Sequence, residues 1–274
     1  MKKIALFFLV ICSFLSEVRA QYSEFGISGG GSFYMGDLNP EIPFKQTMPA
    51  GGVFYRYNFN DRFSVKGAFS AGYLKADDAK SNAQAQVDRN LNFETWLFEL
   101  AVTGEFNFFK YAPGDMQHPV TPFLFGGIAM FKFNPIATAS DGNKYALMPL
   151  GTEGQGTAFY ANRKKYSLVN GSVPFGLGLK ANISKTFSVG LEWGMRFTFT
   201  DFLDDVSGIY ADPNVVLTEK GYIAQELANR STISNSEVTG RQRGNSKTND
   251  WYSFALISLS VNIKAKPAKC PAYQ

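Results

Sequence analysis

The chain has 274 residues, with 27 Lys and Arg against 23 Asp and Glu, 26 Phe, 13 Tyr and a mean hydropathy of −0.13. This near balance of charge gives no basis for nucleic acid as a partner. After the N-terminal segment no run of about 18 apolar residues follows, which excludes a transmembrane helix. High aromatic content with slightly negative hydropathy is typical of a lipid-embedded barrel with a polar interior.

Residues 1–20 have the features of a secretory signal peptide. Two lysines follow the initial Met, and Ile4–Leu15 is an apolar run too short to cross a bilayer. Val18 and Ala20 place small residues just ahead of a cleavage site before Gln21. We therefore expect an exported product, located in the periplasm, the medium or the outer membrane of a Gram-negative cell.

Eight later segments alternate apolar and polar residues with a period of two, over more residues than an ordinary soluble strand. In the clearest one, Leu191 and Trp193 share one face while Glu192 and Arg196 share the other. Such segments are long enough to cross a bilayer when tilted. The eight expected strands are Ser23–Tyr34, Gly52–Phe59, Arg62–Leu74, Asn92–Phe108, Thr121–Phe133, Ser172–Ile183, Phe187–Phe199 and Trp251–Ile263.

The connections between these segments alternate in length. Those after the second, fourth and sixth segments are short, whereas those after the fifth and seventh are the longest and cover residues 134–171 and 201–250. Short periplasmic turns with long outer loops are the expected asymmetry of an outer-membrane barrel. The sequence therefore predicts an all-β fold over residues 21–263. It is a transmembrane antiparallel up-and-down β-barrel of about eight strands, with two long extracellular loops and both termini in the periplasm.

The polar faces of the expected strands carry charges of both signs. A barrel of eight strands has room inside only for its own side chains, and buried charges must be paired. We therefore expect structural ion pairs in a closed lumen and no open pore. The residues concerned are Arg56, Lys66, Glu99, Glu105, Lys180, Glu192 and Arg196.

Candidates for catalytic or metal chemistry are few. His118, the only histidine, lies in a short turn, and a solvated residue is favoured there over a general base. Asp201, Asp204 and Asp205 could hold calcium, but their spacing is not that of a calcium loop, so a rim turn is favoured. Arg163–Lys165 could pair with lipopolysaccharide phosphates or be merely solvated. We recognise no catalytic, cofactor-binding or metal-binding motif and expect a non-enzymatic protein.

The C-terminal tail, residues 264–274, continues past the last expected strand. With Cys12 in the signal peptide, Cys270 is the one cysteine of the mature chain, in an oxidising compartment. An odd cysteine there indicates an intermolecular disulfide or a free thiol. We expect the tail to dock a periplasmic partner through Lys266, Lys269 and Cys270. The alternative is an unbonded thiol on a disordered chain end.

Six stretches carry a family resemblance, in this order along the chain: Phe33–Pro40, Pro49–Asn60, Glu105–Tyr111, Thr198–Asp212, Asp250–Phe254 and Lys269–Cys270. Together they resemble the PorG family, the outer-membrane barrel component of the type IX secretion machinery, also described as a DUF6089-type family. The resemblance covers essentially the mature chain. The segment Asn214–Asn249 is larger than is associated with the family, so the resemblance implies no role for it.

The resemblance implies a non-enzymatic role in assembly. PorG-type barrels are associated with a periplasmic ring made by a lipoprotein, PorK, and its partner PorN. The barrel is then expected to anchor this ring to the outer membrane, with Cys270 as a candidate covalent link. One alternative is a stand-alone structural barrel, adhesin or narrow porin. Others are a lipid hydrolase or outer-membrane protease, and a soluble lipocalin-like barrel, whose outer face should be more polar than Phe187–Phe199 allows.

Overall fold

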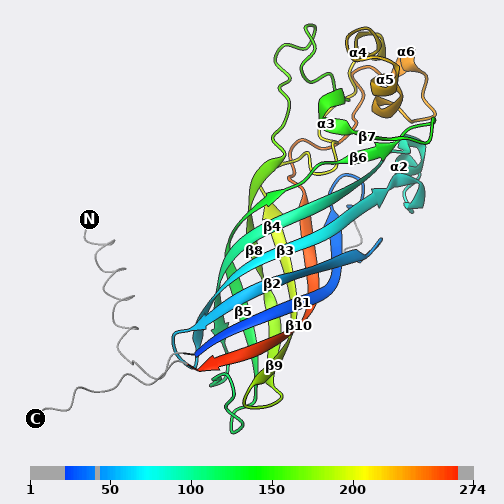
Figure 1. Ribbon diagram of the computed structural model, residues 1–274. Helices are drawn as coiled ribbons and strands as arrows, with labels where there is room; N and C mark the ends of the chain where they lie inside the picture. Colours follow the sequence, from blue (N-terminus) through cyan, green and yellow to red (C-terminus); the bar gives the residue numbers. More distant parts are fainter. Residues whose placement is uncertain (1–21, 41–43, 265–274) are drawn as a thin grey trace, which may run out of the picture.

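The computed structural model describes residues 22–40 and 44–264. The expected signal peptide lies outside the described residues, and so do Lys266, Lys269 and Cys270 of the C-terminal tail. The described chain forms one barrel with its long connections gathered at one end and its short turns at the other (Figure 1). We name these the loop end and the turn end.

Eight long antiparallel strands form the barrel wall. Each pairs with its neighbours in chain order, and pairing of the first with the last and of the third with the fourth closes the sheet. This confirms the predicted up-and-down barrel of eight strands. The strands are β1 (Tyr22–Met35), β2 (Met48–Asn58), β3 (Phe63–Asp77), β4 (Asn92–Asn107), β5 (Val120–Lys132), β8 (Val169–Asn182), β9 (Phe187–Thr198) and β10 (Trp251–Lys264).

Strand β1 contains three consecutive glycines, a feature that weakens a strand. The close approach of β10 explains one of them, because a Cβ on Gly30 would lie 2.0 Å from the carbonyl oxygen of Ala255. The strand nevertheless pairs along its whole length, from Tyr22 opposite Lys264 to Met35 opposite Trp251. The glycines therefore keep the register of the strand, and at Gly30 the absence of a side chain lets β10 approach closely.

The outer face of the wall is apolar over most of its height. In β4 every second residue from Trp96 to Phe106 points outward and is exposed, while the residues between them are buried in the barrel. Exposed apolar side chains recur on the other strands, among them Phe25, Ile27, Val53, Phe69, Leu124, Ile128, Leu177, Leu191, Ile257 and Leu259. A surface so extensively apolar requires a lipid environment. The soluble lipocalin-like alternative is therefore wrong.

The long connections fold into a compact cap over the loop end (Figure 1). We define the cap as residues 36–40, 44–47, 78–91, 133–168 and 199–250. Two short strands extend the sheet into it, β6 (Ile136–Thr138) and β7 (Lys144–Ala146). Its helical segments are η1 (Asp78–Lys80), α2 (Gln84–Arg89), α3 (Leu147–Leu150), α4 (Pro213–Lys220), α5 (Tyr222–Ala228) and α6 (Asn235–Val238). Across the described residues no helix has the length and apolar character needed to cross a membrane.

Candidate functional site

A cluster of buried charges fills the lumen toward the turn end. Glu105 on β4 lies 2.8 Å from Nε of Arg56 on β2 and 3.7 Å from Nζ of Lys66 on β3, and it accepts a hydrogen bond from Lys180 on β8. Glu24 on β1 completes the cluster, with an oxygen 2.7 Å from Nη1 of Arg56. Five strands thus contribute to one network, in which each carboxylate is paired as burial requires.

A second cluster occupies the lumen nearer the loop end. Arg196 on β9 pairs with Glu99 on β4 at 3.1 Å, and the hydroxyl of Tyr252 on β10 donates to Glu99 at 2.7 Å. Glu192, also on β9, pairs with Lys66 of the first cluster. All seven charged residues predicted for the lumen therefore lie there and pair with one another, as expected.

Aromatic rings fill much of the remaining space inside the barrel. Phe123 and Phe125 of β5 point inward, and Lys180 Nζ lies 4.3 Å from the ring centre of Phe123. The cavity left between the two clusters measures about 30 Å³, enough for about two water-sized volumes. The lumen of the described chain is therefore a packed core, and it holds no continuous passage for solute.

The turn end carries an open pocket of about 460 Å³. Tyr111 is buried at its base and donates a hydrogen bond to Asn182 at 3.0 Å, which separates the pocket from the lumen. Asp61, Lys110 and His118 are among the residues that line it. The pocket is therefore a shallow polar recess in the face formed by the short turns.

Two arginines, the half-buried Arg89 and the buried Arg243, bind the separate connections of the cap together. Arg89 of α2 pairs with Asp78 at 2.7 Å and donates to the main-chain carbonyls of Asp37 and Arg243 at 2.8 and 2.7 Å. Arg243 in turn lies 3.1 Å from Glu153 and donates to the carbonyl of Asp205 at 2.6 Å. These contacts join all four long connections, so the cap is one cross-linked unit.

The base of the cap is fixed to the barrel through a buried tyrosine. The hydroxyl of Tyr34 on β1 lies 2.5 Å from an oxygen of Asp204 and 2.8 Å from an oxygen of Asp250. We call these three residues the Tyr34 triad. Gly36 lies directly against it, since a Cβ there would be 1.9 Å from Asp250 Oδ1 and 2.1 Å from Tyr34 Oη. Three stretches that are distant in the sequence, Phe33–Pro40, Thr198–Asp212 and Asp250–Phe254, therefore meet at one point.

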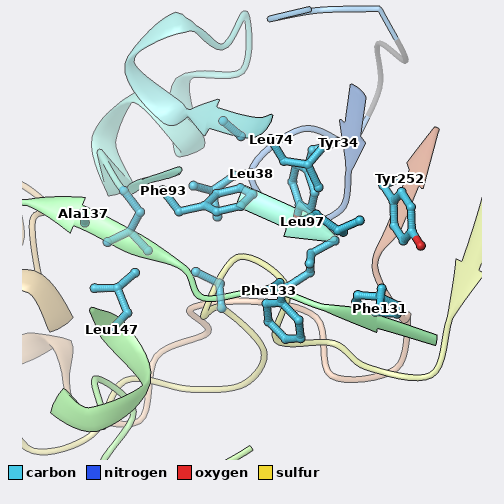
Figure 2. Close-up of a cluster of buried hydrophobic side chains, with 14 of the residues drawn as sticks. Tyr34, Leu38, Leu74, Phe93, Leu97, Phe131, Phe133, Ala137, Leu147 and Tyr252 are labelled. Carbon is cyan, nitrogen blue, oxygen red and sulfur yellow. The ribbon is translucent and has the colours of Figure 1, made fainter. Parts of the chain in front are cut away.

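An apolar core lies between the cap and the barrel mouth. Figure 2 shows the wall residues Tyr34, Leu97, Phe131 and Tyr252 in one cluster that extends to Leu147 of α3 and other cap residues. The Tyr34 ring packs edge-on against Phe93 with ring centres 4.8 Å apart. This continuous packing closes the loop end, so the barrel is sealed at that end as well.

Burial changes the ionisation of several cap carboxyls. It raises the pKa of Asp201 to about 7 and that of Asp205 to about 6. Burial also raises the pKa of Asp204 and of Asp250 well above the usual range. Repulsion from Asp37 raises the pKa of Asp204 further, and repulsion from Asp204 raises that of Asp250. The cap therefore carries less negative charge at neutral pH than its composition suggests.

The candidate residues from the sequence lie in three separate places. His118 is exposed in the turn after β4, 3.0 Å from Asp115, as predicted for a turn residue. Asp201, Asp204 and Asp205 follow β9 at the rim as predicted, but Asp204 and Asp205 are buried network members and not solvated turn residues. Arg163 stacks on Tyr160 at 4.1 Å and donates to the carbonyl of Glu153, so it is a structural residue of the cap.

Several important residues were absent from the sequence-based candidates. Glu24 could have been found, because it alternates with Phe25 and so belongs to the inward face of β1. Arg89 ends the short helix α2, and Glu153 and Arg243 lie in irregular segments, so no long periodic pattern marks these positions. Their pairing depends on contacts between distant parts of the chain, which the sequence pattern does not specify.

The closed wall, apolar exterior and packed lumen define a membrane-spanning β-barrel of the outer-membrane type. Residues 2–149 match the model of a domain of unknown function, DUF6089, and the chain belongs to that family. No curated protein matches the sequence.

Similar solved structures include three outer-membrane proteins. Ail of Yersinia pestis is 10% identical with a TM-score of 0.42, covering 89% of this chain and 100% of its own. Neisserial surface protein A is 9% identical with a TM-score of 0.40, covering 88% and 96%. The N-terminal β-barrel domain of OprF from Pseudomonas aeruginosa is 11% identical with a TM-score of 0.37, covering 89% and 100%.

Proposed function

We propose that this protein is a non-enzymatic anchor of the outer membrane, which holds a periplasmic assembly at its turn end. The observation that carries the proposal is the packed lumen. Glu105 with its three cationic neighbours, and Glu99 with Arg196, occupy the section through which a solute would pass. A barrel filled in this way can fix a position in the membrane, whereas a porin needs a water-filled path.

The turn end is the surface we assign to the partner. It presents the polar recess around Tyr111 and His118, and β10 ends on this side at Lys264, where the tail with Lys266, Lys269 and Cys270 continues. In the proposed orientation this end faces the periplasm, because short turns lie there in outer-membrane barrels. Cys270 would then meet an oxidising compartment, in which an intermolecular disulfide persists.

The resemblance to the PorG family supports a particular assembly. We propose that the partner is the periplasmic ring of the type IX protein secretion machinery, a lipoprotein of the PorK type together with its PorN-type partner. Two stretches of that resemblance are relevant here. Glu105–Tyr111 contains Glu105 of the lumen cluster and Tyr111 of the recess, and Lys269–Cys270 belongs to the tail. Glu105–Tyr111 therefore lies toward the end at which β10 finishes and at which this partner would attach.

Co-purification tests this proposal. The full chain, extracted in mild detergent, should bring down a periplasmic lipoprotein that mass spectrometry identifies as a ring component. Truncation after Lys264 should abolish its recovery, and Cys270→Ser should abolish any complex that only reducing agent dissolves. Lys164→Ala, an exposed cap residue at the opposite end, is the matched control and should leave recovery unchanged. Recovery of the barrel without any periplasmic protein would contradict the proposal.

A second candidate function is adhesion through the cap. The observation that favours it is that the cap exposes Phe159 of the connection before β8 and Tyr222 of α5, which are 68% and 63% exposed. Exposed aromatic side chains are frequent anchors in protein interfaces. If adhesion is the function, Phe159→Ser with Tyr222→Ser abolishes attachment of cells to a surface or host matrix. Unchanged attachment would remove this candidate and leave the anchor proposal untouched.

A further inference from the structure

The Tyr34 triad combines three polar groups away from solvent. Tyr34, Asp204 and Asp250 are each 1% exposed. The Tyr34 hydroxyl oxygen approaches carboxylate oxygens of both aspartates within hydrogen-bonding distance, at 2.5 and 2.8 Å. The other oxygen of each carboxylate accepts a main-chain N–H, from Val206 for Asp204 and from Leu203 for Asp250. Every oxygen of the triad is thus engaged.

A count of protons shows that the triad is one proton short when both aspartates are ionised. The tyrosine hydroxyl has a single proton and can donate to only one carboxylate. The second oxygen–oxygen contact would then be a repulsive contact between two unprotonated acceptors. It becomes a hydrogen bond if one carboxyl keeps its proton and donates it to the tyrosine oxygen, as a protonated carboxyl can.

We propose that Asp204 and Asp250 share one retained proton through Tyr34, and that this proton is a pH-sensitive latch holding the cap on the barrel. Tyr34 lies near the end of β1, Asp204 near the start of the connection between β9 and β10, and Asp250 at its end. The latch therefore closes the base of the longest connection against the wall. Loss of the proton leaves two buried negative charges in contact with one hydroxyl, and the base opens.

The charged surroundings favour retention of the proton. Asp37, from the connection after β1, and Asp201, from that after β9, raise the pKa of the triad carboxyls through repulsion, while Arg89 of α2 acts in the opposite direction. Beyond these, Glu153 and Arg243 pair with each other. Arg89 itself pairs with Asp78. Burial raises the pKa of both triad carboxyls more than any of these charges.

The sign of the pH effect follows from this retained proton. Above about pH 4 an opened cap loses the proton to solvent, because a free aspartate has a pKa of about 3.9, whereas the closed cap keeps it. The closed form therefore binds more protons, and rising pH favours opening. For one proton, the equilibrium constant for opening increases about tenfold per pH unit. This increase ends at the pH at which the closed form loses the shared proton as well.

Hydrogen exchange of the full chain in detergent micelles measures this opening directly. The amides of Leu203 and Val206 are the probes, since both donate to triad carboxylates. In Asp250→Asn or Asp204→Asn the amide group replaces the protonated carboxyl and donates to Tyr34 without titrating. Relative to either single variant, opening in the wild type should rise about tenfold per pH unit, because intrinsic exchange cancels in the ratio.

The double variant distinguishes a shared proton from simple removal of charge. With Asp204→Asn and Asp250→Asn together, two amide donors face Tyr34 and its own proton lacks an acceptor, so exchange should be faster than in either single variant. Asp88→Asn, on the exposed side of α2, should keep the wild-type slope. Equal pH slopes in the wild type and both single variants would overturn the proposal. So would a double variant as protected as the single ones.

Discussion

Arg243 and Glu153 form a buried ion pair at 3.1 Å that joins the two longest connections of the barrel. They are 90 residues apart in the chain, and each is almost fully enclosed by the cap. The same guanidinium donates to the carbonyls of Asp205 and Ala228. This one side chain therefore contacts both residues 133–168 and residues 199–250 and helps to hold them together.

Removal of this guanidinium should destabilise the cap strongly. Arg243→Ala leaves Glu153 and Asp205 buried without their cation, a change that costs about 3–5 kcal/mol. Denaturant unfolding followed by limited proteolysis of the cap measures the loss. Arg241→Ala, two residues away and exposed, should stay within about 0.5 kcal/mol of the wild type. Equal effects of the two substitutions would show that the ion pair does not support the cap.

Gly36 should tolerate no side chain. In Gly36→Ala the added Cβ meets Asp250 Oδ1 and Tyr34 Oη at distances far below contact, so the Tyr34 triad must move. We expect a loss of about 1–3 kcal/mol, the usual cost of overpacking. Gly29→Ala in the preceding strand β1 is the control, because no atom lies within 4 Å of its Cβ position. Thermal unfolding of the two variants separates steric conflict from a general effect on β1.

Asp201 should make the cap less stable as the pH rises. Burial raises the pKa of its carboxyl to about 7, so the native cap holds a proton that the unfolded chain has lost. The free energy of unfolding therefore falls between about pH 4 and about pH 7. Asp201→Asn should reduce this decline in a series of thermal unfolding curves. An identical pH profile for the wild type and the variant would contradict the assignment.

A charged residue on the outer face of the wall should destabilise the barrel more near the middle of the bilayer than near its edge. Leu100 lies midway along β4 and Val120 at the first residue of β5, and both point outward. Leu100→Arg should cost about 2–4 kcal/mol in a bilayer, and Val120→Arg about 0–1 kcal/mol. Refolding into lipid vesicles at a series of denaturant concentrations gives both values. Equal costs for the two substitutions would contradict the placement of Leu100 near the middle of the bilayer and of Val120 near its edge.

The eight strands were predictable because membrane-spanning strands repeat a simple rule over many residues. Phe187–Phe199 alternates almost without exception, and the structure places β9 at Phe187–Thr198. The start of β2 was placed too late, at Gly52 in place of Met48, because Pro49 and Gly51 interrupt the pattern. The paired lumen charges were predictable for the same reason, since an inward position on a closed barrel leaves a charge no partner but another inward charge.

The cap was not predictable in the same way. Asp204 and Asp205 look like solvated turn residues in sequence, and their burial depends on Tyr34, Thr152 and Tyr166, which come from other parts of the chain. The positions of such partners follow from tertiary packing of irregular segments. The sequence offered only proximity of the three aspartates, and that signal fits a turn equally well.

We propose that the barrel is a sealed support in the membrane and not a conduit. Electrical recording from the purified chain reconstituted in a planar lipid bilayer tests it most directly. The packed clusters around Glu105 and Glu99, with a cavity of only about 30 Å³ between them, predict no stepwise ion conductance at any holding potential that the bilayer withstands. Reproducible single-channel steps from the wild-type protein would contradict it.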